Sequence, residues 1–233
     1  MFNARSKRLE RIDTGDYTSD EYEIFLREIA FINRYLGDGR AVKKSLLREI
    51  GSQELNEFSI LDVGCGSGEL LKIIAEFALR SGRKATLAGI DLNPISAAAT
   101  NSLSLSFPEM NAIQGDANKL PFADGCFDYV ISSLFFHHLS DTQIPNVLRE
   151  MSRVAARGIF VIDLHRHPAA YLLYKLFCSA FRISPLVRQD GSLSIKRGFK
   201  PDEFSEYIRD AGLKLKTIER ATPFRIIVRS DCR

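Results

Sequence analysis

The sequence lacks the features that mark membrane-spanning and disulfide-stabilised proteins. No apolar run approaches the roughly 18 residues of a membrane helix, and the charged start, MFNARSKRLERIDTGDY, has no apolar segment typical of a signal peptide. The four cysteines lie far apart, without the CxxC spacing of a zinc ribbon, so neither a disulfide framework nor a structural zinc is predicted. These absences favour a soluble protein of the reducing cytoplasm.

The chain also has no internal repeat, no low-complexity segment and no composition shift that would mark a linker. Its 233 residues, 45% hydrophobic and 26% charged, suffice for one sizeable core and are too few for two comfortable domains. We therefore predict a single domain over residues 1–233.

A strong net charge is missing as well. The formal value of +3 is too mild to indicate a nucleic-acid partner by itself. The charge is unevenly distributed, because residues 140–200 hold ten lysines or arginines against four acidic residues. This basic segment is the one feature that favours RNA or a protein as the substrate.

Short apolar runs alternate with longer helical patterns from residue 58 onward, which predicts that strands and helices alternate. The runs are β-branched and nearly continuous, as is typical of a parallel sheet covered by helices on both faces. The predicted strands are 58–64, 84–92, 111–116, 126–134 and 158–164, followed by a closing pair at 213–220 and 223–230.

Helix boundaries carry their own signals. A helix over 67–81 should end at Gly82, and another should occupy 201–212. Three helix starts have capping residues: Thr18 with Glu21 for an N-terminal helix, Asn93 before Pro94, and Ser140 with Gln143 for a helix to about residue 155.

A glycine-rich loop, GCGSG at residues 64–68, joins the first predicted strand to the next helix. Glycines at such a turn let the backbone approach a ligand closely. Glu69 stands where a dinucleotide fingerprint has its last glycine, and together with Asp62 it would repel a pyrophosphate. The two carboxylates favour a cation. S-adenosylmethionine, a nucleoside with an ammonium, a sulfonium and no phosphate, fits this charge pattern.

Two further carboxylates follow the next predicted strands. Asp91, at the end of the second strand, can accept hydrogen bonds from both ribose hydroxyls, and Asp116, after the third, can accept from an adenine amino group beside the Ala117 backbone N–H. The predicted cofactor contacts are Asp62, Gly64, Cys65, Gly66, Asp91, Leu92, Asp116, Ala117, Ser132, Ser133 and, toward the cofactor carboxylate, Arg34.

Together and in this order, ILDVGCGSGEL, GIDLNP and GDANKLPFADGCFDYVISSLFFHHL resemble the class I S-adenosylmethionine-dependent methyltransferases, especially the branch with quinone-biosynthesis and other small-molecule enzymes. The resemblance covers about residues 58–164. It implies an α/β, doubly wound seven-stranded sheet of order 3-2-1-4-5-7-6 whose last strand is antiparallel. To this core we add an N-terminal helical extension (1–50), an inserted helix after strand 5 (within 167–199) and a closing helix and strand pair (200–233).

Two nucleic-acid activities are disfavoured. The Asn/Asp-Pro-Pro-Tyr/Phe motif of enzymes that methylate base amines is replaced by SSLFF after the fourth strand. Methylation at cytosine C5 needs a nucleophilic cysteine after that strand, whereas Cys126 precedes it and Cys178 lies in an apolar helix.

All four histidines follow two neighbouring strands: His137 and His138 after the fourth, His165 and His167 after the fifth. Ligands of doubly wound sheets bind at these strand ends, so His138 and His165 are predicted as general bases for an acceptor hydroxyl. A structural or positioning role and zinc binding are the alternatives. No metal site is predicted, because the acid pairs of a catechol-type magnesium site are missing from these loops.

The segment 167–199 is apolar and basic. Leu172, Leu173, Leu176 and Phe177 have helical spacing and either line a hydrophobic acceptor pocket or belong to an ordinary core helix. An anionic head group or, through 168–182, a membrane surface would meet Lys175, Arg182 and Arg188.

The predicted function is methyl transfer from S-adenosylmethionine to a small hydrophobic acceptor, at oxygen or an activated ring carbon of a phenolic, polyketide or quinone-like compound. Methylation of RNA or protein is one alternative, supported by the basic segment alone. An inactive cofactor-binding protein that regulates or scaffolds a partner is the other.

Overall fold

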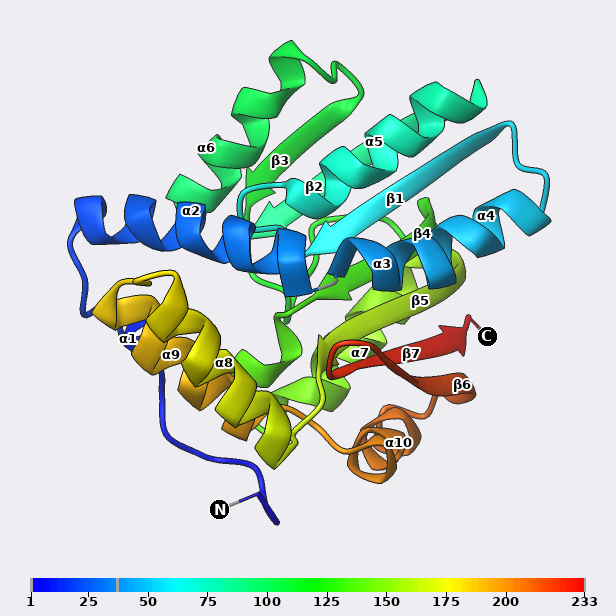
Figure 1. Ribbon diagram of the computed structural model, residues 1–233. Helices are drawn as coiled ribbons and strands as arrows, with labels where there is room; N and C mark the ends of the chain where they lie inside the picture. The colour runs from blue at the N-terminus through cyan, green and yellow to red at the C-terminus, as the bar shows by residue number, and fades with distance from the viewer. Residues whose placement is uncertain (1, 37, 233) are drawn as a thin grey trace.

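The computed structural model describes residues 2–36 and 38–232, and a seven-stranded sheet forms its centre (Figure 1). The strand order is β3-β2-β1-β4-β5-β7-β6. Strands β1 to β5 pair in parallel, whereas β7 runs antiparallel to both β5 and β6. The predicted order and antiparallel strand are confirmed. The strands are β1 Glu57–Val63, β2 Lys84–Asp91, β3 Met110–Gln114, β4 Phe127–Ser133, β5 Ala155–Leu164, β6 Lys214–Ala221 and β7 Arg225–Asp231.

Strand β1 contributes to two cores, because successive side chains of a strand point to opposite faces of the sheet. Leu61 and Val63 pack with the helices α7 (Gln143–Val154) and α10 (Pro201–Asp210) on one face. Phe58 and Ile60 pack with α5 (Glu69–Ser81) on the other. This burial on both faces explains why the apolar runs in the sequence are nearly continuous.

Strand β5 begins three residues before its predicted start. Ala155 already pairs with Phe127 of β4, and the register then shifts between Phe127 and Tyr129. Arg157 points outward and donates to Asp128 at 2.8 Å. This charged residue interrupts the apolar pattern, so the first three residues of the strand could not be recognised from hydropathy.

The helix caps follow the predictions at most ends. Gly82 ends α5 in the left-handed conformation, with φ 67°. Asn93 caps α6 (Pro94–Ser102) by accepting from the Ile95 N–H. The helix α7 begins at Gln143, two residues after the start that a cap at Ser140 predicts, because the Ser140 hydroxyl donates to the Gln143 side chain and does not cap a backbone N–H.

The N-terminal extension contains α1 (Arg11–Thr14), α2 (Ser19–Leu36), α3 (Asp38–Val42), the π-helix η1 (Lys43–Leu47) and α4 (Arg48–Ser52). The Thr18–Glu21 capping box is formed in both directions, at 2.9 and 3.2 Å. In Figure 1, α2 crosses the molecule beside the ends of β1 and β2.

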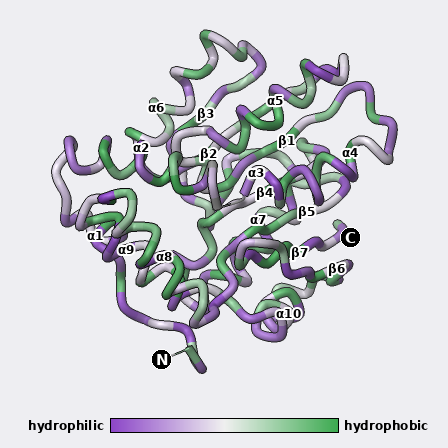
Figure 2. The backbone as a smooth tube through the Cα atoms, viewed as in Figure 1, coloured by the Kyte–Doolittle hydropathy of each residue, from purple (hydrophilic) through white to green (hydrophobic). Residues whose placement is uncertain are grey.

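The segment after β5 folds into two helices, α8 (Pro168–Ala180) and α9 (Pro185–Arg197), where one was predicted. Pro185 can start a helix but cannot continue one, and Arg182 before it takes a left-handed φ of 51°. Figure 2 shows hydrophobic colours over much of α8. A separate small core joins these helices to α2; it contains Ile32, Ala170, Tyr174, Cys178, Ile183, Val187 and Ile195.

Within the described residues, no helix combines the length and the apolar character needed to cross a membrane.

Candidate functional site

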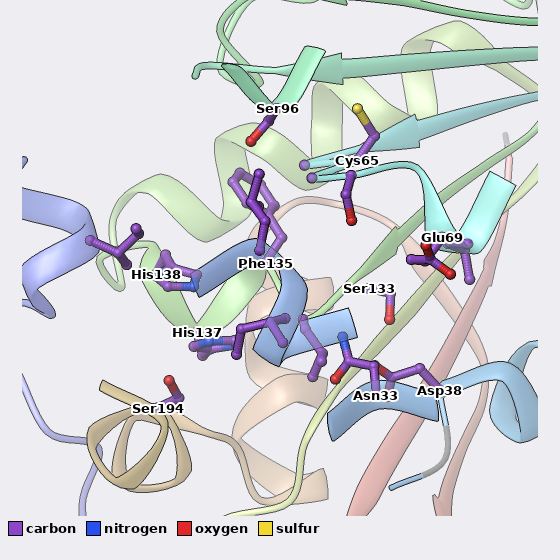
Figure 3. Close-up of a pocket in the computed structure, with 18 of the residues that line it drawn as sticks. Asn33, Asp38, Cys65, Glu69, Ser96, Ser133, Phe135, His137, His138 and Ser194 are labelled. Atoms are coloured by element: carbon purple, nitrogen blue, oxygen red, sulfur yellow. The ribbon is translucent and has the colours of Figure 1, made fainter. Parts of the chain in front are cut away.

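A cavity of about 2070 Å³ lies at the carboxyl ends of the central strands, between the glycine loop, the N-terminal helices and the helices α8 and α9. Pockets for single small ligands usually measure about 300–1,000 Å³, so this cavity has room for a cofactor and an acceptor together. Figure 3 shows Cys65 and Ser96 on one side of it and His137, His138 and Ser194 on the other, with Phe135 between them.

Most of the predicted cofactor contacts meet in this cavity. Its lining includes Asp62, Gly64, Cys65, Gly66, Asp91, Leu92, Asp116, Ala117 and Ser133.

The glycine loop is held in place by backbone conformations that favour glycine. Gly64 has φ 77°, and a Cβ added to it would lie 2.6 Å from the ring of Phe135. Gly66 has φ 53° with no heavy atom within 4 Å of an added Cβ, so its backbone borders open space. Its N–H donates to Asp91 Oδ2 at 3.0 Å, while Asp91 Oδ1 accepts from the Asn93 N–H at 2.9 Å. Asp91 therefore joins the two loops that follow β1 and β2.

Asp62 is a buried carboxylate that lacks a compensating partner. Its side chain lines the cavity, and its Oδ1 has no hydrogen-bond partner among the described residues. Burial, and secondly the charge of Asp91, raise the pKa of Asp62 to about 8. An unpaired carboxylate in such surroundings favours a cation, and the ammonium of an amino-acid ligand meets this requirement.

Replacing Asp62 by asparagine should stabilise the protein at alkaline pH and weaken cofactor binding. The folded-state pKa lies above the ordinary value of 3.8, so the wild type loses stability as the pH rises from about 4 through 8. The variant has no charge to bury, and above pH 8 it should gain about 1–3 kcal/mol, or several degrees in Tm. Calorimetry should find its cofactor affinity reduced about tenfold. A Tm difference that does not change between pH 5 and pH 8.5 would contradict this assignment.

Asp116 and Ala117 both line the cavity. Asp116 is exposed, and its Oδ1 accepts from the backbone N–H and side-chain amide of Asn118, at 2.8 and 2.9 Å. Asn118 also lines the cavity and was missed in the sequence, although it follows directly in the GDAN run.

Ser132 does not line the cavity, although it was predicted to contact the cofactor. It is fully buried, and its hydroxyl donates to the Val63 carbonyl at 2.7 Å, so it ties β4 to β1. The next residue, Ser133, faces the cavity because side chains alternate along a strand, and its buried hydroxyl has no partner within residues 2–36 and 38–232. Arg34 lies in α2, but its side chain is outside the described part of the chain.

The two histidine pairs have different environments. His137 and His138 line the cavity, whereas His165 and His167 are absent from its lining. His167 Nδ1 accepts from the Ala169 N–H and caps α8. His165 was predicted as a general base, but it lies outside the cavity lining, where its backbone forms a β-bridge with Phe199. Burial, and secondly the charge of Arg220, lower the pKa of its imidazole. A base role for His165 would require the acceptor to reach beyond this cavity.

His138 is the predicted base that does face the cavity. Its Nδ1 lies 2.6 Å from Asp13 Oδ1. Burial lowers the pKa of its imidazole, but Glu10 and Asp13 outweigh this effect and raise the pKa to about 9. In this arrangement both ring nitrogens are protonated at neutral pH, and the imidazolium cannot accept a proton. A base role for His138 therefore stays a prediction and requires the contact with Asp13 to change.

Several residues that line or contact the cavity were missed in the sequence. Glu10 and Asp13 lie beside the histidines, and Arg197, the last residue of α9, donates to the carbonyls of His137 and His138 at 2.6 Å each. Asp163, near the end of β5, accepts from the His137 ring at 2.8 Å. Only Asp163 carried a sequence signal, as an acid at a strand end beside predicted site residues.

The model of the methyltransferase domain family matches residues 60–158, which contain the glycine loop, the second half of β1 and all of β2 to β4. Among curated relatives, the chain is 32% identical over 149 residues to an uncharacterized methyltransferase of Synechocystis, which covers 60% of this chain. It is 29% identical over 168 residues to the ubiquinone biosynthesis O-methyltransferase of Pseudomonas paraeruginosa, which covers 69% of this chain. The matches span 66% of the length of each of these relatives.

A solved structure with the same fold is that of a SAM-dependent methyltransferase from Aquifex aeolicus. Its TM-score is 0.66 at 20% sequence identity, and the match covers 89% of this chain and 97% of that one.

Proposed function

The chain belongs to the class I S-adenosylmethionine-dependent methyltransferases, and from this membership we propose that it methylates a small, hydrophobic acceptor. The acceptor would be a phenolic, polyketide or quinone-like compound, methylated at oxygen or at an activated ring carbon. The observation that carries this proposal is the large cavity, which joins the cofactor residues to an apolar region. The Pseudomonas relative is named as an O-methyltransferase of ubiquinone biosynthesis, which supports the same acceptor class.

The cofactor would occupy the part of the cavity formed by the core (58–164). Asp62 would hold its ammonium, Asp91 its ribose hydroxyls, and Asp116 with Ala117 its adenine. The bound cofactor supplies an activated methyl group on sulfur. The protein's part is then to align the acceptor nucleophile with that methyl group and to exclude water.

The acceptor would occupy the part formed by the N-terminal extension (1–50) and the insert (167–199). Apolar side chains from both segments line the cavity there, including Phe25 and Ile29 of α2 and Leu173 and Phe177 of α8. Phe224, in the turn between the last two strands, adds a further ring. A lining of this kind suits a flat or branched hydrophobic molecule.

The structure weakens the main support for RNA as the acceptor. Much of the basic segment is engaged within the protein: Arg153 pairs with Asp124 and Glu150, Arg157 with Asp128, Arg166 with Glu203, and Arg197 with Asp13. These cations are neutralised by the protein's own carboxylates, which lowers their attraction for phosphates.

The peripheral membrane contact predicted for 168–182 stays a prediction. Its support is the outer face of α8 and the turn after it, where Leu172, Leu176 and Phe181 are exposed. Lys175 stacks on the Tyr171 ring, with its Nζ 4.9 Å from the ring centroid.

The proposed activity can be tested with Leu173→Asp. Leu173 is 53% exposed and lines the cavity, so an aspartate there remains hydrated. The substitution should change the free energy of unfolding by less than about 0.5 kcal/mol. Methyl transfer to phenols and hydroquinones should show a raised KM with cofactor affinity unchanged. Leu79→Asp, a substitution of a leucine that is 75% exposed and lies outside the cavity lining, is the control.

If the wild type binds the cofactor but methylates no member of the panel, the small-acceptor proposal fails and the inactive cofactor-binding protein is favoured. Equal kinetics for Leu173→Asp and Leu79→Asp would mean that the acceptor lies elsewhere.

A further inference from the structure

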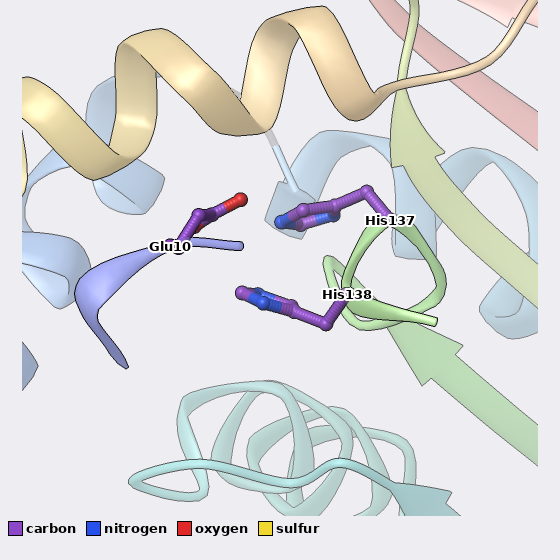
Figure 4. A group of neighbouring side chains, drawn as sticks. All are labelled: Glu10, His137 and His138. Atoms are coloured by element: carbon purple, nitrogen blue, oxygen red, sulfur yellow. The ribbon is translucent and has the colours of Figure 1, made fainter. Parts of the chain in front are cut away.

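Three side chains on the acceptor side of the cavity form a cluster separate from the glycine loop. Glu10 precedes α1, while His137 and His138 belong to the short helix η3 (Phe136–His138) that follows β4. Figure 4 shows the Glu10 carboxylate and both imidazole rings gathered at one point. One ligand atom from each residue lies within 4.8 Å of the other two.

Hydrogen bonds to carboxylates orient both rings. His137 Nδ1 lies 2.8 Å from Asp163 Oδ1, and His138 Nδ1 lies 2.6 Å from Asp13 Oδ1. An Nδ1–H that donates to a carboxylate leaves the Nε2 lone pair of a neutral ring available. The same carboxylate-to-histidine arrangement surrounds most histidines that bind metals, because it fixes the tautomer and increases the basicity of Nε2.

Glu10 supplies an independent sign that a ligand belongs here. Its side chain is 2% exposed, and while its Oε2 accepts from the Ser194 hydroxyl at 2.8 Å, its Oε1 has no hydrogen-bond partner in the described part of the chain. Arg197 Nε is 3.8 Å from that oxygen but donates to the His137 carbonyl. A buried carboxylate oxygen left in this state favours the approach of a cation.

The surrounding charge also suits a divalent ion. The side chains that touch the cluster carry the carboxylates of Asp13 and Asp163 and the guanidinium of Arg197. Together with Glu10 they leave two negative charges uncompensated when both rings are neutral, and for His138 this state is reached when the metal displaces the proton that the ring carries in the metal-free protein. A divalent cation would balance them.

We propose that Glu10, His137 and His138 form a binding site for a divalent transition metal, with Zn²⁺ best suited to one carboxylate and two imidazoles. Tetrahedral zinc, with bonds of about 2.0–2.2 Å, places its ligand atoms about 3.4 Å apart. The side chains would therefore close by at most about 1.4 Å from the present 4.8 Å. The prediction of no metal site considered only the strand-end loops, and Glu10 lies outside them.

The site would leave a coordination position open toward the cavity, since all three residues line it. A metal there lowers the pKa of a hydroxyl bound to it, which would supply the deprotonated oxygen that methyl transfer requires. This role, unlike the metal site itself, rests on the proposed function.

The site can be tested with Co²⁺, whose visible absorption reports tetrahedral binding. Metal-stripped wild type should bind Co²⁺ stoichiometrically and release it to Zn²⁺. Glu10→Gln, which keeps an acceptor for Ser194, and His138→Asn should each lose the absorption, whereas Asp13→Asn should bind about 10–100-fold more weakly. His165→Asn, outside the cavity lining, is the matched control and should bind like the wild type.

Melting curves of the metal-free variants will show whether each is folded, and His138→Asn provides a second test if Glu10→Gln is not. No absorption in the wild type, full binding by Glu10→Gln, or loss in His165→Asn alone would each overturn the proposal. Calorimetry with S-adenosylhomocysteine on the same metal-free protein tests the proposed function separately, because its predicted contacts lie on the other side of the cavity.

Discussion

Replacing Arg197 by methionine should lower the free energy of unfolding by about 3–5 kcal/mol, the usual cost of removing one partner from a buried ionic network. The Arg197 side chain is buried, and its nitrogens donate to the carbonyls of His137, His138 and Arg8. It also donates to Asp13 Oδ2 at 2.9 Å. Without it, Asp13 and Glu10 would remain buried and would lose one of the cations beside them, so that the protonated ring of His138 would have to balance both carboxylates. At about 2–4 °C per kcal/mol, Tm should fall by on the order of 10 °C.

Arg209→Met is the matched control for that experiment. Arg209 lies in α10 with its side chain 75% exposed, and its ion pair with Asp210 is 4.0 Å long, so its loss should change stability by less than about 0.5 kcal/mol. Limited proteolysis should cut Arg197→Met early within residues 2–16, because Arg197 ties this segment to η3. Equal melting temperatures for the two variants would show that Arg197 does not hold the segment in place.

The meeting of the three carboxylates in one cavity could be predicted from the sequence, because each of them lies at or next to a strand end. Parallel strands place their carboxyl ends along one edge of the sheet, so Asp62, Asp91 and Asp116 had to lie near one another once the strands were recognised. Their shared negative charge indicated the kind of ligand. Ser132 was predicted to contact the cofactor but faces the interior, whereas its neighbour Ser133 faces the cavity. Successive side chains of β4 point to opposite sides, so an error of one residue changes the environment.

The opposite side of the cavity, around Glu10 and His138, could not be predicted in this way, because it is assembled by contacts between distant segments. Glu10 and Ser194 are separated by 184 residues, and no local pattern indicates that they touch. The same contacts determine the state of His138: its neighbours Glu10 and Asp13 raise its pKa to about 9, although burial alone would lower it. A histidine at a strand end predicts a polar site but not its protonation.

The apolar face of α8 shows a related limit. Of the four residues expected in a pocket or in the core, Leu173 and Phe177 line the cavity, whereas Leu172 and Leu176 do not line it and are more than half exposed. The residues that α8 buries are Ala170, Tyr174 and Cys178, spaced by four along a different face. Because α8 is hydrophobic around most of its circumference, periodicity could not identify which face the neighbouring helices cover.

Replacing Asp91 by alanine should weaken the binding of S-adenosylmethionine by about 10–100-fold. If its carboxylate accepts from the ribose hydroxyls, the variant loses a charged hydrogen bond worth about 1.5–3 kcal/mol. Asp91 also accepts from the backbone N–H groups of Gly66 and Asn93, so part of the loss could come from a loosened glycine loop. Affinity for the cofactor alone does not separate these two causes.

A cycle with two ligands separates them. Adenosine and 2′,3′-dideoxyadenosine differ only in the ribose hydroxyls, and calorimetry of both on the wild type and on Asp91→Ala isolates the interaction between those hydroxyls and the carboxylate. If Asp91 holds the ribose, the wild type should prefer adenosine by about tenfold or more, and the variant should bind the two ligands almost equally. A loosened loop would instead lower the affinity for both ligands by the same factor and leave the preference for adenosine unchanged. The two ligands are compared on the same protein, so a change in the loop affects both equally. If Asp91→Ala still prefers adenosine over 2′,3′-dideoxyadenosine, the ribose hydroxyls are bound by another residue.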